Sequence, residues 1–448
     1  MHPQTVRAAL SFLACSTLFN LTTTFFNLPA AQAQTTQTQT TQAQKAHTQK
    51  AQAKAAPAEA PVEWCKIVSR STSSPRLIQG SDNQWNLVYE LITTNYSSSD
   101  LNLEKLSVFS GADRKSPLKE FSPEDLKKII LCVAKPNQRL TIKPGESAIL
   151  WMNLEFSKKP QGLKKLTHLF SIKEQEASEN KSRDEKNAVP DKEKAGQDKE
   201  KSEEPVINTV SVKVDEREPV VIGSPLKGKN WLAMGGYCGF LGHRRALMPI
   251  GNKLVLSQRY AIDWIKFDKN WNDWKGSFKN PQNSVCYGEP ILAVEDGTVV
   301  GVIEKFEDQP TFVEGKDLDY PGGNCITLDI GNGHYAFYAH IKPGGIKVKR
   351  GEKVKKGQII GLVGNSGHSF EPHLHFHITD KPEILKGDGI PYVIDGFSLL
   401  GTAEKLKRYD TNKPRTLPAP VKLLKEPERR TNQIPREGAI VNFIDQKN

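Results

Sequence analysis

The sequence predicts a mainly β protein, in which an N-terminal β-sandwich is followed by a compact antiparallel β domain. Short segments that alternate apolar and polar residues, such as residues 85–91 and 148–154, have the period of strands. Turn residues such as Pro144-Gly145-Glu146 separate these segments, and residues 123–134 have the pattern of a single helix. A chain of 448 residues is too long for one compact core, so two folded domains are expected.

The first 33 residues have the order of a secretory signal peptide. Arg7 precedes a largely apolar run over residues 8–28, and Ala31-Gln32-Ala33 is typical of a cleavage site. A retained membrane anchor is the alternative, which polar residues within the run disfavour. We therefore expect export to the periplasm or the extracellular cell wall, with no stable membrane span after processing. Residues 34–61, rich in Gln, Thr, Ala and Lys, are expected to form a disordered linker.

Residues 62–222 are expected to form the β-sandwich-like domain. Short strands with turn signals between them are typical of that architecture. Residues 174–205 consist mostly of Lys, Glu, Asp and Ser, which predicts a disordered insertion, and strand-like residues 206–214 follow it. The domain has no cluster of His, Asp or Cys, so we expect it to position or bind rather than to catalyse.

Residues 223–400 are expected to form the second domain, and residues 401–448 a basic C-terminal tail. Glycine becomes frequent in the second domain, and seven of the ten histidines lie between His243 and His377. The six cysteines are widely spaced without a CxxC pair, which predicts neither a disulfide framework nor a structural zinc knuckle.

The formal charge of +11 implies attraction to polyanions, either nucleic acid or phosphate- and carboxylate-rich wall polymers. Nucleic-acid binders of this charge interleave aromatic side chains with the basic ones, and no such patch is visible here. We therefore expect no nucleic-acid partner.

The run Pro372-His373-Leu374-His375-Phe376-His377-Ile378 is the main indication of chemistry. In a strand, residues two apart share a face, so the three histidines point one way and the apolar residues point into a core. Imidazoles on one strand face are a natural start for a zinc site, whose ligands are neutral nitrogens and carboxylates.

Two further segments supply candidate residues. Asp263 lies in the apolar run Tyr260-Ala261-Ile262-Asp263-Trp264, where a carboxylate is costly unless it is paired or bound to metal. His340 ends the apolar run 334–340, after the turn-forming residues 329–333. Taken alone, Asp263 would be interpreted as a structural residue in a salt bridge. His340 could be a general base, a proton shuttle or a histidine at a strand end whose hydrogen bonds are satisfied.

Together these segments resemble the lysostaphin-type (LytM-like) zinc metalloendopeptidases, which are peptidoglycan hydrolases. The resemblance runs from about residue 243 to 379, under a third of the chain. It is carried by five pieces in the family's order: Tyr260-Ala261-Ile262-Asp263, residues 288–300, Tyr338-Ala339-His340, residues 351–367 and His373-Leu374-His375.

The resemblance implies a compact antiparallel β fold of the duplicated-hybrid-motif or β-hammerhead type, with Zn²⁺ in a groove across the sheet. It implies Asp263 and His375 as zinc ligands, and His340 and His373 as the catalytic histidines. The family's first ligand is a histidine four residues before the aspartate, but this chain has Arg259 there, which stays protonated and cannot bind zinc. Four residues apart on one strand, Arg259 and Asp263 are expected to share a face, so that Arg259 points toward the metal groove and pairs with a carboxylate of the protein or of the substrate. His243 is the leading substitute, with His377 and His368 as weaker candidates; a plain loop histidine is the alternative for His243.

The expected function is that of an exported zinc endopeptidase that cuts peptide cross-links of peptidoglycan in cell-wall remodelling. One alternative is a non-catalytic regulator or wall-binding protein with a degenerate metal site, for which Arg259 is the direct support. Another is a carrier domain, because residues 344–358 resemble the turn of biotinyl and lipoyl domains. Such a domain has no use for the three alternating histidines, so it ranks last. A regulatory protein partner would be a further, unidentified component.

Overall fold

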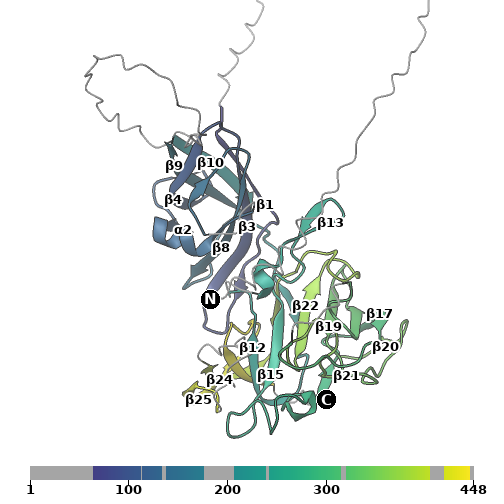
Figure 1. The fold of residues 1–448 in the computed structure, drawn as a ribbon. Helices are drawn as coiled ribbons and strands as arrows, with labels where there is room; N and C mark the ends of the chain where they lie inside the picture. Colours follow the sequence, from purple (N-terminus) through teal and green to yellow (C-terminus); the bar gives the residue numbers. More distant parts are fainter. Residues whose placement is uncertain are drawn as a thin grey trace, which may run out of the picture.

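A computed structural model describes residues 64–112, 114–133, 138–175, 206–238, 242–313, 319–403 and 418–443. The expected signal peptide (1–33), linker (34–61) and nearly all of the charged insertion (174–205) lie outside these residues. The protein is mainly β, with antiparallel pairing throughout its large sheets (Figure 1). Among the described residues, no helix is both long enough and apolar enough to cross a membrane.

The first domain consists of two five-stranded antiparallel sheets around a shared hydrophobic core. One sheet has the order β1-β3-β8-β6, with β2 beside β3: β1 (Ile67–Ser71), β2 (Ile78–Gln79), β3 (Trp85–Asn95), β6 (Ile130–Cys132) and β8 (Ser147–Phe156). The other has the order β10-β9-β4-β5, with β7 beside β4: β4 (Asp100–Ser110), β5 (Lys119–Phe121), β7 (Thr141–Ile142), β9 (Lys165–Gln175) and β10 (Val206–Lys213).

The helix α2 (Pro123–Ile129) covers one end of this domain and is shorter than the sequence predicts. It begins at a capping box in which the Ser122 side chain and Asp125 satisfy each other's backbone N–H groups. The predicted helical stretch to residue 134 is wrong at its end, because Ile130–Cys132 pairs with β8 as a strand.

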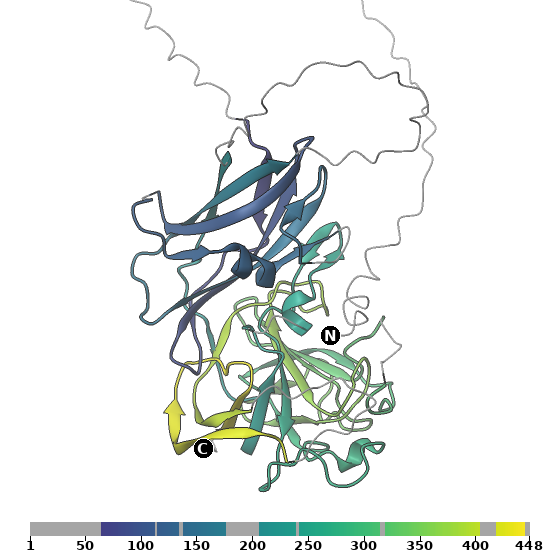
Figure 2. The same cartoon turned by 60° about the vertical axis from the view of Figure 1, so that its left-hand side comes forward.

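A ten-stranded antiparallel sheet forms the centre of the second domain (Figure 2). Its order is β20-β17-β18-β19-β22-β15-β12-β26-β24-β25. The strands are β12 (Gly228–Met234), β15 (Ile262–Lys266), β17 (Gly297–Ile303), β18 (Cys325–Asp329), β19 (Tyr335–Ala339), β20 (Lys353–Val354), β22 (Leu374–Thr379), β24 (Phe397–Ala403), β25 (Val421–Arg430) and β26 (Ala439–Phe443).

In the described residues, three two-stranded sheets and two 3-10 helices complete the second domain. The pairs are β11 (Val220–Ile222) with β23 (Tyr392–Ile394), β13 (Met248–Ile250) with β14 (Lys253–Val255), and β16 (Pro290–Leu292) with β21 (Ile359–Leu362). The 3-10 helices are η2 (Gly242–Arg245) and η3 (Pro281–Asn283).

Two boundaries of the sequence-based division differ from the structure. Val220–Ile222, placed at the end of the first domain, pairs in parallel with β23 of the second. The expected basic tail is wrong for residues 421–430 and 439–443, which are strands of the ten-stranded sheet. The apolar run Ala439-Ile440-Val441 after Gly438 carries the strand signal, but the basic and Pro-containing residues around it obscure it.

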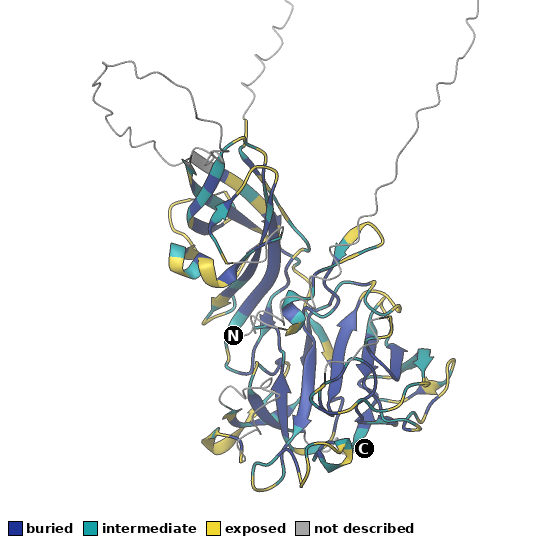
Figure 3. Cartoon of the chain, in the orientation of Figure 1, coloured by how far each residue is buried: buried dark blue, intermediate teal, exposed yellow. Residues whose placement is uncertain are grey.

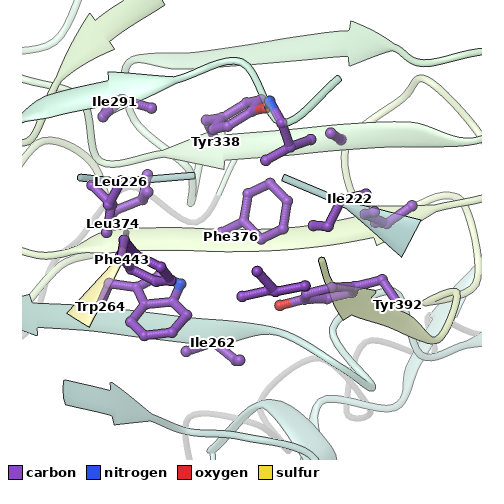
Figure 4. Close-up of a cluster of buried hydrophobic side chains, with 14 of the residues drawn as sticks. Ile222, Leu226, Ile262, Trp264, Ile291, Tyr338, Leu374, Phe376, Tyr392 and Phe443 are labelled. Carbon is purple, nitrogen blue, oxygen red and sulfur yellow. Dashed lines mark hydrogen bonds between the residues drawn. The ribbon is translucent and has the colours of Figure 1, made fainter. Parts of the chain in front are cut away.

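The apolar faces of the central strands build one large core (Figure 4). Phe376 and Leu374 of β22 point into it, opposite the histidine side of the strand, together with Trp264 of β15 and Tyr338 of β19. Figure 3 shows these central strands as almost continuously buried. The core therefore fixes which way each histidine of β22 faces.

Candidate metal centre

Strand β22 presents three histidines to a pocket of about 210 Å³. His373 precedes the strand, and His375 and His377 lie within it; all three line the pocket while Leu374 and Phe376 lie in the core. The predicted alternation of faces is confirmed. Asp263, His243 and His340 line the same pocket, so the structure brings together all five residues predicted for the site.

Asp263 lies opposite His375 in the antiparallel pairing of β15 with β22. Its Oδ1 is 2.9 Å from Nδ1 of His375 and 3.3 Å from Nε2 of His373. Burial by itself would raise the pKa of this carboxyl, but the neighbouring imidazoles, His243 foremost, hold the pKa well below its usual value. Asp263 is therefore an ionised carboxylate in a buried site, which favours a cation beside it.

His243 reaches the site from the short 3-10 helix η2 rather than from the sheet. Its Nε2 is 3.4 Å from Asp263 Oδ1, and its ring centroid is 4.7 Å from that of His375. The other ring nitrogen, Nδ1, lies 3.0 Å from the carbonyl oxygen of Gly235. Gly235 has a φ of +69°, and a Cβ there would lie 2.7 Å from His243 Nδ1, so only glycine leaves this ring in place.

His340 follows β19 in the left-handed backbone region, with a φ of 61°. Few residues other than glycine adopt this conformation, and such residues cluster at functional sites. The bend turns the imidazole towards His373, with ring centroids 4.6 Å apart. Burial, together with the neighbouring His373 and His375, lowers the pKa of His340 well below its usual value, so the ring is neutral.

Backbone carbonyls fix the tautomers of three of the histidines. Nδ1 of His340 lies 2.8 Å from Ser366 O, and Nδ1 of His373 lies 2.7 Å from Glu371 O; His243 has the equivalent contact described above. A carbonyl only accepts, so each Nδ1 is the donor. In a neutral ring Nε2 therefore carries the lone pair that can take a metal ion or a proton, and in His243 and His373 this nitrogen faces Asp263 Oδ1.

Within the part of the chain that the structure describes, two groups of side chains have the geometry to hold one metal ion, and both include His375. In the first, ligand atoms of His243, Asp263 and His375 lie within 4.8 Å of one another; in the second, those of His340, His373 and His375 do. The first set supplies two imidazoles and one carboxylate, the kind of three-ligand set that catalytic zinc uses while keeping a position open. Burial lowers the pKa of His375 to about 4, so this ligand is neutral near pH 7. The donor set therefore fits Zn²⁺.

His377 and His368, the weaker ligand candidates, occupy different places. His377 belongs to neither ligand group, but its Nδ1 lies 2.9 Å from Nε2 of His375. It therefore contacts the ring edge that faces away from Asp263. His368 lines the pocket and is in neither group. Sequence reasoning put His377 on the correct face but missed its contact with His375, which depends on ring orientation.

Arg259 does not point into the metal site, so the prediction that it shares a strand face with Asp263 is wrong. Strand β15 begins only at Ile262, after a turn. The Arg259 guanidinium donates from Nε to Glu90 at 3.1 Å and from Nη1 to Gly389 O at 3.2 Å. The carboxylate expected to pair with it is therefore Glu90, from the first domain.

Comparisons with known proteins agree with this site. Residues 282–386 match the profile of peptidase family M23, a range that contains His340, His373 and His375 but neither His243 nor Asp263. Lysostaphin of Staphylococcus simulans is 38% identical over 90 residues, 20% of this chain and 15% of the relative. The peptidoglycan DD-endopeptidase ShyA of Vibrio cholerae is 43% identical over 92 residues, 20% of this chain and 17% of the relative.

An uncharacterized metalloprotease of Buchnera aphidicola is 31% identical over 147 residues, 32% of this chain and 35% of the relative. The matched stretches thus cover about a third or less of these relatives' lengths. Among solved structures, the catalytic domain of lysostaphin from Staphylococcus simulans is 27% identical and covers 34% of this chain and 80% of that chain, with a TM-score of 0.19. A TM-score this low carries no argument, so the likeness is one of sequence: residues 282–386 match peptidase family M23, and this stretch of the chain is similar to lysostaphin-type peptidases.

Proposed function

We propose that this protein is a zinc-dependent endopeptidase that hydrolyses peptide cross-links of bacterial peptidoglycan in cell-wall remodelling. One observation carries the proposal: His243, Asp263 and His375 converge beside His340 and His373 at the floor of a single pocket. The relatives named above include a peptidoglycan endopeptidase, and the basic charge of the chain suits a substrate rich in carboxylates.

The residues divide into two roles. His243, Asp263 and His375 would hold the zinc ion, which when bound polarises the scissile carbonyl and makes water a stronger nucleophile at neutral pH. His340 and His373 lie beside that position with the lone pair of the neutral ring on Nε2, because their Nδ1 atoms donate to Ser366 O and Glu371 O. Each can accept a proton from water or hold one for the leaving amine, which is the work of a general base and acid.

The pocket walls also suit a peptide chain. Phe337, Phe370 and Leu385 supply apolar surface around the polar floor, a combination typical of substrate pockets. The Arg259 cation is turned towards Glu90 and away from Asp263, so it does not oppose a metal ion in the pocket, and His243 offers the third ligand in place of residue 259.

Export to the periplasm or the extracellular wall is part of the proposal, because the substrate lies outside the cytoplasm. It rests on the order of charges and apolar residues in the first 33 residues. Amino-terminal analysis of the protein recovered from outside the cytoplasm is expected to give a start near Gln34. An intact Met1 on a membrane-embedded product would contradict this part.

The central test measures metal content and cleavage together. The purified protein is stripped with a chelator, reloaded with Zn²⁺ and incubated with cross-linked muropeptides, whose products are identified by mass spectrometry. We expect cleavage of a cross-link that is lost on stripping and restored by zinc, with His373→Ala as the inactive control. A zinc-loaded protein that leaves every cross-link intact would refute the catalytic role.

A further inference from the structure

The segment that carries His243 is packed against the first domain. Just after η2, Leu247 and Leu256 are buried in one hydrophobic cluster with side chains of the first domain. Those partners are Ile92 on β3 and Ile149 and Trp151 on β8. Residues 242–256 therefore lie between the metal pocket and the first domain, whereas Asp263 and His375 belong to paired strands of the central sheet.

Arg244, the neighbour of His243, makes the polar part of this contact. It is 3% exposed, and its Nη2 donates to Met152 O of β8 at 3.2 Å. The same Nη2 lies 3.4 Å from Glu90 Oε1 of β3. Arg245 stacks its guanidinium over the Trp151 ring at 4.9 Å. Two consecutive arginines next to a candidate metal ligand are thus held by the first domain.

Glu90 is the fully buried anion at the centre of this contact. Its Oε2 accepts from Arg259 Nε at 3.1 Å and from Thr72 Oγ1 at 2.8 Å, while Oε1 faces Arg244. Burial by itself would raise its pKa, but Arg259 and Arg244 lower the pKa below its usual value, so Glu90 is ionised. A buried charge needs such partners, because leaving one unpaired strongly destabilises the fold.

We propose that the first domain is part of the metal centre: through Glu90 and Met152 O it holds Arg244, and Arg244 positions the zinc ligand His243. The backbones of Asp263 and His375 are held by strand pairing within the central sheet and do not depend on the first domain for their position. Within the second domain, the hydrogen bond from His243 to Gly235 O sets the tautomer of the ring, and the position of η2 depends on what its arginines contact. The first domain is thereby assigned a role in metal binding, and this inference rests on the proposed zinc site.

The proposal distinguishes between the two arginines that share Glu90. Arg244→Met in the full chain leaves Glu90 paired with Arg259, so the buried charges stay balanced and the domains stay folded. It frees η2, and we expect zinc affinity to fall by about 10-fold or more, the usual effect of losing the support of a ligand. Arg259→Met is the matched control. It removes the other arginine that pairs with Glu90 and leaves Arg244 in place, so the zinc affinity should not change.

Three tests separate a positioning role of Arg244 from a general loss of stability. The absorption spectrum of the Co²⁺-loaded protein reports the ligand set, and it should change for Arg244→Met but not for Arg259→Met. Arg244→Lys keeps a cation near Glu90 and should recover part of the zinc affinity. Glu155→Gln, which removes a different inter-domain ion pair, to Arg436 at 3.1 Å, should leave zinc affinity unchanged.

The outcomes separate this inference from the proposed function. If the unaltered protein binds no zinc, the proposed metal site itself fails. If the unaltered protein binds zinc and a folded Arg244→Met binds it equally well with the same Co²⁺ spectrum, the positioning role of the first domain is wrong. Equal losses in Arg244→Met and Arg259→Met would also overturn it, because the effect would then belong to the charge cluster as a whole.

Discussion

His375 and His377 form a hydrogen-bonded pair of imidazoles, with Nε2 of His375 2.9 Å from Nδ1 of His377. The opposite nitrogen of His375, Nδ1, faces Asp263 Oδ1, also at 2.9 Å. When His375 offers the Nδ1 lone pair to a metal ion, its Nε2 carries the proton and donates it to His377. Both rings line the pocket, and the contact with His377 orients the ring of His375, the candidate metal ligand, from the side opposite Asp263.

The pair predicts that His377→Phe weakens zinc binding. Phe fills a similar volume beside Phe337, whose ring centroid is 5.0 Å from that of His377, but it cannot accept the hydrogen bond from His375. Loss of such a partner typically costs 10–100-fold in metal affinity. Competition with a chelating dye measures it, with His368→Gln as the control that keeps affinity. An unchanged affinity for His377→Phe would show that the strand alone orients His375.

Replacing His243 should decide which of the two possible ligand groups holds the ion. His243→Ala leaves Asp263 and His375 as two ligands, too few for the three that catalytic zinc uses, so metal content should fall to near zero. His334→Ala, a histidine outside the pocket, is the matched control. Full zinc occupancy in His243→Ala would move the ion to the group formed by His340, His373 and His375.

The two flanking histidines are expected to affect turnover without affecting metal content. His340→Ala and His373→Ala each remove an Nε2 that handles a proton, which is worth roughly a hundredfold or more in rate. Zinc should remain at one ion per chain in both variants, as mass spectrometry under non-denaturing conditions can show. Metal loss matching that of His243→Ala would mean that these histidines are ligands.

Gly235 is expected to be as necessary to the site as His243 itself. In Gly235→Ala, the added methyl group would meet the His243 ring at 2.7 Å, and the φ of +69° adds strain of about 1–2 kcal/mol. Gly331→Ala is the matched control, since it has a φ of +84° but nothing within 4 Å of the new Cβ. Both variants should lose stability, measured by thermal unfolding, but only Gly235→Ala should lose zinc affinity. Equal zinc affinity in the two would contradict the close packing described here.

His168 predicts a pH dependence of stability that originates in the first domain. It is fully buried, with Nε2 2.7 Å from the Tyr89 hydroxyl and Nδ1 3.3 Å from Val210 O, and burial lowers its pKa to about 4. In the unfolded chain the pKa is about 6.5, so the unfolded state binds more protons between those values. The contribution that neutral, buried His168 makes to the free energy of unfolding is complete above pH 6.5. It declines as the pH falls towards 4 and does not change further below that pH.

The stability that His168 loses on acidification amounts to roughly 3 kcal/mol, from the difference between its pKa values in the folded and unfolded states. Urea unfolding of the unaltered protein and of His168→Gln, at pH 7 and pH 4.5, measures it as the difference in pH dependence between the two. His168→Gln should be less stable at pH 7 and should lose less stability on acidification. Parallel pH profiles would mean that His168 is not the titrating group.

Period-two alternation was sufficient to predict the faces of β22, because a strand with an apolar core on one side leaves only one orientation for His373, His375 and His377. Asp263 and His340 could be found because polar residues in apolar strands stand out in the sequence. The convergence of His243 with Asp263 and His375 was predicted from the need for a third ligand rather than from any local pattern.

The orientation of Arg259 could not be predicted, since it depends on Glu90, a residue 169 positions away on another domain. Local spacing suggested a strand that continues back to Arg259, whereas a turn intervenes before Ile262. The contact of Arg244 with Met152 O was equally hidden, because neither residue is unusual in its own neighbourhood. Contacts between domains leave little trace in a single sequence.

The position of β26 has a consequence for the order in which the molecule is assembled. Ala439–Phe443 lies between β12 and β24, so the edge of β12 stays unpaired until these residues leave the ribosome. β12 is the neighbour of β15, the strand of Asp263. The ten-stranded sheet therefore cannot be completed during synthesis of residues 228–403, and its closure waits for residues 439–443. A growing chain thus lacks a finished sheet beside the strand of Asp263 until residue 443 has been synthesised.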